Sequence, residues 1–142
     1  MTRVAPLTML LLVGCSRAPI APVASPGAAD HSVVADEITL DGEPPPEDFA
    51  DRVREHAEAL VERAERCYAE RLDARPALGG EQRLRVYVSA AQVIRVTTEA
   101  STLEDPPLED CIKQQILQYE LPPDAPRGGV FVRFRLTFTP PA

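Results

Sequence analysis

The chain has 142 residues and a formal net charge of −7 at pH 7, with 22 acidic residues against 15 basic ones. This length suits one modest domain, and the acidic balance argues against a nucleic-acid partner, because phosphate binding needs clustered lysine and arginine. An acidic chain likewise gains no electrostatic attraction to an anionic membrane surface.

The first fourteen residues have the order of a bacterial secretion signal. Arg3 precedes an apolar run over 7–13, which ends in Leu12-Val13-Gly14-Cys15. This run is too short to span a bilayer core of about 30 Å. Its end resembles the lipobox of bacterial lipoproteins, in which the thiol is diacylated and the chain is cut before the cysteine. The resemblance implies a signal peptide over 1–14 and a lipid on Cys15. The alternative is an uncleaved anchor with a chance cysteine.

Attachment to a membrane is expected to come from this lipid and not from charge. Cleavage would remove Arg3, the only charged residue of the signal, so the net charge would go from −7 to −8. A cysteine with two or three acyl chains is held durably by a bilayer. Ser16 follows the cysteine where sorted inner-membrane lipoproteins have aspartate, and this resemblance favours the outer membrane, facing the periplasm.

Residues 15–48 are predicted to be a disordered tether. Proline recurs there among alanine, serine, glycine and acidic residues, a composition that buries too little apolar surface to offset the entropy lost on ordering. Proline-rich linkers extend at about 3.1 Å per residue. The alternative is a short strand or a partner-binding patch formed by Val33-Val34 and Ile38-Thr39-Leu40.

A long amphipathic helix is predicted over 49–72, with Asp48 as its N-cap. Its apolar residues recur at intervals of three and four, with charged residues between them. Arg75-Pro76 and Gly79-Gly80 end the helix. The apolar stripe consists of Phe49, Val53, Ala57, Leu60, Val61, Ala64, Cys67, Tyr68 and Leu72.

Two strands over 83–89 and 93–98 alternate apolar and polar residues and are predicted to form a hairpin, although Ala90-Ala91-Gln92 is an unusual turn. A second helix opens at Glu104-Asp105-Pro106-Pro107, with proline in its first turn. Its apolar stripe consists of Leu108, Cys111, Ile112, Ile116 and Tyr119.

The last strand, over 130–138, has the clearest alternation. The element order helix, strand, strand, helix, strand predicts an α+β domain over 49–142: a three-stranded antiparallel sheet with both helices on one face, preceded by the disordered tether. The residues expected to face the core are Val130, Val132, Phe134, Leu136 and Phe138. Those expected to face away are Phe131, Arg133, Arg135 and Thr137.

Cys67 and Cys111 are predicted to form a disulfide. With Cys15 assigned to lipid, they are an even pair in an oxidising compartment, and each lies on the apolar stripe of its helix. They are too far apart in sequence for a CxxC redox motif. The alternative is two free thiols that pack as small apolar groups.

The sequence lacks the motifs of common enzymes and metal sites. There is no Cys/His spacing for zinc, no GxSxG elbow, no phosphate-binding glycine loop and no calcium loop. His56 lies near the apolar face of the first helix, where a boundary histidine is favoured over a general base. We therefore expect no catalytic residue, no metal and no cofactor.

Several short landmarks resemble a known domain over about 50–139. They are Cys67-Tyr68-Ala69-Glu70, Pro76-Ala77-Leu78-Gly79, Ser101-Thr102-Leu103, Glu109-Asp110-Cys111, Leu121-Pro122, Gly128-Gly129 and the closing strand. Together they resemble the C-terminal domain of gliding-motility proteins of the AgmX/PglI type, which is similar to the TonB C-terminal domain.

This resemblance implies a non-enzymatic protein-binding module. TonB-like domains add a partner's strand to a sheet edge, and the edge is expected in 130–138 or in one hairpin strand. Phe131, Arg133 and Arg135 form an apolar and basic strip that is expected to bind an envelope protein, with an ordinary solvent-facing strand as the alternative. A structural accessory lipoprotein of an envelope or motility complex is a second interpretation, and a hydrolase or redox protein a third. The oligomeric state is left open.

The lipid anchor gives the first testable prediction. Cys15→Ser removes the thiol that would carry the acyl chains, so the protein is expected to leave the membrane fraction or to stay as an unprocessed precursor. Fractionation of cells with immunodetection measures both outcomes. A Cys15→Ser protein that is processed normally and remains with the membrane contradicts the prediction.

Overall fold

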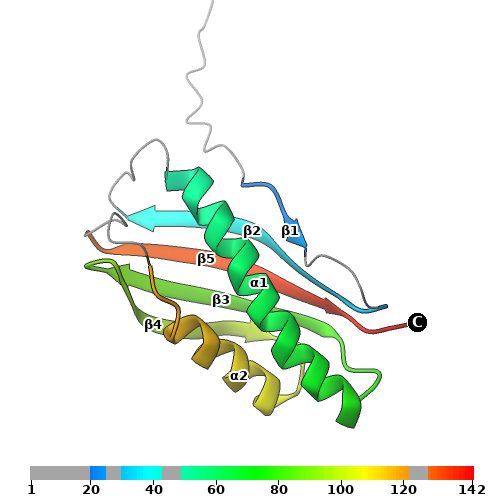
Figure 1. The fold of residues 1–142 in the computed structure, drawn as a ribbon. Helices are drawn as coiled ribbons and strands as arrows, with labels where there is room; N and C mark the ends of the chain where they lie inside the picture. The colour runs from blue at the N-terminus through cyan, green and yellow to red at the C-terminus, as the bar shows by residue number, and fades with distance from the viewer. Residues whose placement is uncertain (1–19, 25–29, 43–48, 122–127) are drawn as a thin grey trace, which may run out of the picture.

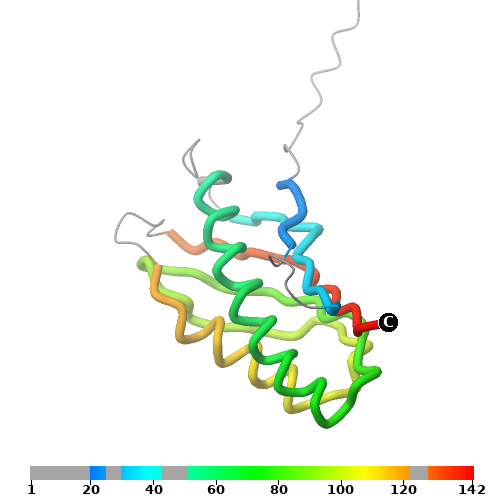
Figure 2. Tube along the Cα trace, turned by 45° about the vertical axis from the view of Figure 1, so that its right-hand side comes forward, coloured from blue at the N-terminus to red at the C-terminus, as the bar shows by residue number. Residues whose placement is uncertain are grey.

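The computed structural model describes residues 20–24, 30–42, 49–121 and 128–142. Within them, two helices and five strands follow in the order β1, β2, α1, β3, β4, α2, β5. Figures 1 and 2 show both helices on the same side of a single sheet. The predicted α+β class, with two helices and an antiparallel sheet, is confirmed. Among these residues, no helix is both long and apolar enough to cross a bilayer.

The sheet has five strands in the order β1-β2-β5-β3-β4, so the predicted three-stranded sheet is wrong. All neighbouring strands are antiparallel. The two additional strands come from the segment predicted as a disordered tether, whose residues 15–19, 25–29 and 43–48 lie outside the described residues. The strands are β1 (Val23–Ala24), β2 (Ser32–Gly42), β3 (Gly80–Ser89), β4 (Gln92–Ser101) and β5 (Val130–Thr139).

Strand β2 exists because it has an apolar face of its own. Val33, Ala35 and Ile38 are buried beneath α1 (Phe49–Ala74), whereas Asp36 and Thr39 belong to the other face. The spacing of the buried residues changes from two to three at a β-bulge, where Glu37 has φ 50°. The alternative of a strand in this segment is therefore correct.

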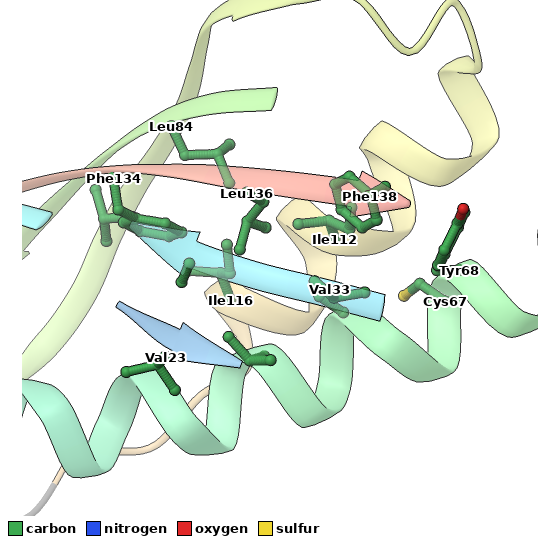
Figure 3. Close-up of a cluster of buried hydrophobic side chains, with 14 of the residues drawn as sticks. Val23, Val33, Cys67, Tyr68, Leu84, Ile112, Ile116, Phe134, Leu136 and Phe138 are labelled. Atoms are coloured by element: carbon green, nitrogen blue, oxygen red, sulfur yellow. The ribbon is translucent and has the colours of Figure 1, made fainter. Parts of the chain in front are cut away.

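The core lies between the sheet and the two helices, as Figure 3 shows. Strand β5 contributes Phe134, Leu136 and Phe138 to it, in agreement with the predicted alternation. Tyr68 of α1 is fully buried, and its ring meets the Phe138 ring edge-on at 5.1 Å. The Tyr68 hydroxyl donates a hydrogen bond of 2.5 Å to the carbonyl of Leu78, which satisfies its polar group, and burial raises its pKa.

A two-residue turn closes the β3–β4 hairpin. Ala90 and Ala91 both have positive φ, 49° and 60°. This is the backbone of a type I′ turn, which matches the twist of the flanking strands but normally uses asparagine and glycine. The predicted hairpin is present, with a turn that alanine does not favour.

Asp105 holds α1 against α2 (Pro106–Leu117). Its carboxylate, 1% exposed, accepts two hydrogen bonds of 2.9 Å from Arg71 and one of 3.0 Å from Arg75. The same carboxylate caps α2 by accepting from the backbone N–H of Leu108 at 2.9 Å. The hydrogen bonds from Arg71, with those from Leu108 and Arg75, lower the pKa of Asp105 to about 2.

Cys67 and Cys111 form the predicted disulfide between the same two helices, with their Cα atoms 6.0 Å apart. Cys67 is buried and Cys111 is partly buried, so the bridge lies at the edge of the core. The bridge and the Asp105 carboxylate thus tie the second half of α1 to the first half of α2.

Removal of the Asp105 charge is expected to destabilise the domain. Asp105→Asn keeps a capping side chain but loses the charged hydrogen bonds, at an expected cost of about 1.5–3 kcal/mol. Asp105→Ala loses the cap as well, which adds about 1 kcal/mol. Urea unfolding measures both. Asp110→Asn is the control, because the Asp110 side chain is 71% exposed and its pairing with Lys113 contributes at most about 1 kcal/mol.

The contribution of the Asp105 carboxylate to the stability of the fold should depend on pH in a definite direction. Because the pKa of Asp105 in the folded protein, about 2, lies below its ordinary value of 3.8, the stabilisation is present above pH 4 and is lost as the pH falls toward 2. The difference in stability between the wild type and Asp105→Asn should therefore shrink over this interval. A difference that is constant from pH 6 to pH 2 contradicts the proposed role of the charge.

Reduction of the disulfide is expected to lower the melting temperature. The cysteines are 44 residues apart, and closing a loop of this size stabilises a fold by about 4 kcal/mol in the chain-entropy model. Thermal unfolding with and without reductant measures the effect, and the Cys67→Ser/Cys111→Ser variant should behave like the reduced protein. Free thiols in the native protein, or a melting temperature that reductant leaves unchanged, would reject the bridge.

Candidate protein-binding surfaces

The predicted strip on β5 lies on the face of the sheet opposite the helices, hereafter the open face. Arg135 makes two hydrogen bonds with Asp36 of β2, of 2.8 and 2.7 Å. It also lies 3.4 Å from Glu37 and 3.6 Å from Glu81. The contact with Asp36 raises the pKa of Arg135 and lowers that of Asp36. Arg135 therefore joins β2, β5 and β3 within the molecule.

Arg133 is also engaged within the chain. Its guanidinium lies 3.2 Å from Asp41 of β2 and 3.3 Å from Glu99 of β4, so its contacts reach across the sheet. The side chain is 44% exposed, however, and such surface ion pairs contribute little to stability. Arg133 is thus more accessible to a partner than Arg135, which is 23% exposed.

Phe131 belongs to an aromatic cluster on the same face. Its ring centroid lies 4.8 Å from that of Tyr87, and the guanidinium carbon of Arg85 lies 3.9 Å above its ring. Contacts of this kind are stabilising. The structure places Phe131, Arg133 and Arg135 together, as predicted, but each already has partners within the fold.

Strand β5 cannot be the edge that accepts a partner's strand, because β2 and β3 pair with its two sides. Of the two predicted positions, only the hairpin remains, and β4 is its outer strand. A single bridge between Gln92 and Glu120 occupies the start of this edge; beyond it, no other described residue pairs with the outer side of β4. The opposite edge is β1, which is only two residues long.

Two bulges divide β4. They lie at Ile94 and Glu99, where the pairing with β3 shifts by one residue, and bulges of this kind limit unwanted pairing at sheet edges. The residues between them keep a regular register with β3. Ile94 is 50% exposed, and together with Leu117 at 40% it is one of the two large hydrophobic side chains that are exposed among the described residues. Neither the bulges nor this exposure was predicted from the sequence.

An apolar cavity of about 80 Å³ lies between the first half of α1 and the sheet. Most of the residues that line it are aliphatic, including Leu60, Val86 and Leu136. Pockets for drug-sized ligands have volumes of about 300–1,000 Å³, so this cavity is too small for one. It resembles a packing gap of the kind that stays dry.

His56 is one of the residues that line this cavity. Its Nδ1 is 2.6 Å from the hydroxyl of Tyr119, a contact that links α1 to the segment after α2. Burial raises the pKa of Tyr119. His56 thus has a structural contact at the boundary of the core, where it was predicted. Within the described part of the chain, no group of three or more histidine, cysteine or acidic side chains is arranged to hold a metal ion.

Cys15, the predicted lipidation site, lies outside the described residues. Comparison of the sequence with family models, with curated proteins and with solved structures found no match.

Proposed function

We propose that this chain is a lipid-anchored protein of the bacterial cell envelope. In this proposal Cys15 carries the lipid, and the domain over 49–142, together with β1 and β2, is a non-enzymatic module that binds protein in the manner of TonB-like domains. The anchor holds the module at the membrane, with the outer membrane favoured by Ser16 and the periplasm as its surroundings.

The observation that carries the proposal is the free edge of β4. An extended strand offers a row of backbone N–H and C=O groups there, and an added strand gains main-chain hydrogen bonds along it. The helices lie on one face of the sheet (Figure 2), and α2 contacts β4. A partner strand that pairs with this edge would thus extend the sheet by one strand, on the side where α2 packs against β4.

The open face supports the same interpretation. The exposed Arg95 lies on the edge strand itself, and Arg133, 44% exposed, reaches Glu99 of that strand from β5, so the side chains of an added strand would meet charged groups as well as the backbone. Main-chain pairing would supply affinity, and these side chains would supply selectivity.

Site-specific cross-linking in intact cells tests the proposal. A photo-reactive residue at Thr97, exposed in the middle of the β4 edge, is expected to give adducts with another polypeptide in the membrane fraction. The same residue at Glu62, exposed on α1, is the matched control and should give far fewer. Equal adducts at both positions, or none at Thr97, would contradict binding at the β4 edge.

A further inference from the structure

The stretch of β4 from Arg95 to the bulge at Glu99 places three exposed residues on the open face. Arg95 is in register with Tyr87 and Thr97 with Arg85, and both of these β3 residues contact Phe131 on that face. Glu99 reaches Arg133 on the same face. Arg95, Thr97 and Glu99 therefore lie on one side of a free edge, with opposite charges two positions before and two positions after Thr97, the second of them at the bulge.

Such a sequence is complementary to a second copy of itself. If two β4 strands pair antiparallel about a two-fold axis at Thr97, Arg95 of each copy lies directly opposite Glu99 of the other. Directly opposed residues have Cβ atoms about 4.5–5.5 Å apart, and opposite charges in these positions are stabilising. The symmetry supplies this pairing twice, as an isologous interface requires.

No neighbouring register pairs both charges. A two-fold axis perpendicular to the sheet places the open faces of both copies on the same side. Because side chains alternate between the two faces along a strand, residues of the same face oppose each other only if the axis passes through a residue and not between two residues. With the axis at Val96, Arg95 would oppose Thr97. With the axis at Thr98, Glu99 would oppose Thr97. Only the register centred on Thr97 gives every charged group of the stretch an opposite partner.

We propose that the strand which adds to the β4 edge is the β4 strand of a second copy of this chain, in antiparallel register centred on Thr97. The inference rests on the proposed function, because it names the partner of the same edge. It would join the two sheets of five strands into one continuous sheet across the two-fold axis.

The charged groups are available for this contact. Arg95 is exposed and has no ion pair among the described residues. Glu99 is 38% exposed and meets Arg133 through one oxygen, Oε1, and Arg133 also has Asp41 nearby at 3.2 Å. A carboxylate accepts several hydrogen bonds, so Glu99 can also meet Arg95 of the second copy. The exposed Ile94, next to Arg95, lies at the end of the paired stretch, where a second copy would cover part of it.

The paired stretch is short, which implies a weak association. Stable interfaces usually bury more than about 1,000 Å², and a few backbone pairs at one edge bury less. Two copies held in one membrane by their lipids would meet at a much higher local concentration than in solution. Self-pairing is therefore expected at the membrane more than in dilute solution.

A disulfide across the axis tests the register. In Thr97→Cys, the new cysteines of two copies lie directly opposite each other, within the Cα separation of about 7 Å that a disulfide allows. The full chain in isolated membranes, oxidised with copper phenanthroline, should yield a covalent dimer. Arg95→Cys is the matched control, because the register separates the two residues 95 by four positions, about 14 Å along the strand.

Charge reversal tests the complementarity. Arg95→Glu and Glu99→Arg, each combined with Thr97→Cys, should lower the yield of covalent dimer about tenfold, because both symmetric pairs become repulsive. Co-expression of the two reversed chains should restore it, since every pair in the mixed dimer is again attractive. Thermal unfolding of each variant checks that the fold is intact, and sedimentation of the purified protein in detergent gives a readout without cysteine chemistry.

The outcomes separate this inference from the proposed function. No Thr97→Cys dimer, an equal yield from Arg95→Cys, or failure of the mixed chains to restore the dimer would overturn self-pairing. If the photo-reactive residue at Thr97 then still gives an adduct with a different protein, strand addition at β4 stands with another partner. If it gives no adduct at all, both proposals fail.

Discussion

The sheet depends on the position of β5, which pairs with β2 on one side and with β3 on the other. Without this strand, β1 and β2 would separate from the β3–β4 hairpin, and strand pairs of this size are marginally stable by themselves. The bidentate contact of Arg135 with Asp36 strengthens one of the two ladders from the open face. On the other face, Asp105 and the disulfide hold the two helices together over the joined strands. One central strand thus makes the open face continuous and leaves β4 as the long free edge.

The local part of this architecture was predictable from the sequence. The residues of β5 that were expected to face the core are buried or partly buried, because strict alternation over nine residues leaves one consistent arrangement. Both helices follow from apolar spacing, and the pairing of Cys67 with Cys111 follows from their positions on the two apolar stripes. In each of these cases the signal is the local spacing of residues, within one strand or helix or, for the cysteines, within each of the two helices.

The parts of the fold that were not predicted depend on contacts between residues far apart in the chain. Strand β2 was only the alternative to a disordered tether, because prolines surround it and because its bulge at Glu37 interrupts the alternation that marks a strand. Its main polar contact, Asp36 with Arg135, joins residues 99 positions apart, which no local pattern reveals. The strip on β5 was placed on the correct face, but its ion pairs and the role of β4 as the edge follow from strand order, which composition and spacing do not specify. The missed elements are therefore those whose stability comes from partners far away in the chain.

The hairpin turn has a consequence for how the sheet opens. Ala90 and Ala91 adopt left-handed backbone conformations that cost L-residues about 1–2 kcal/mol each, so the turn opposes the hairpin that it closes. Strand β4 is then held by its ladder with β3 and by α2, with no contribution from local turn preference. Amide hydrogens near Gln92 should exchange with solvent through local opening earlier than those of β5, which is paired on both sides. The strand with the long free edge is thus also one that its own turn does not help to hold in the sheet.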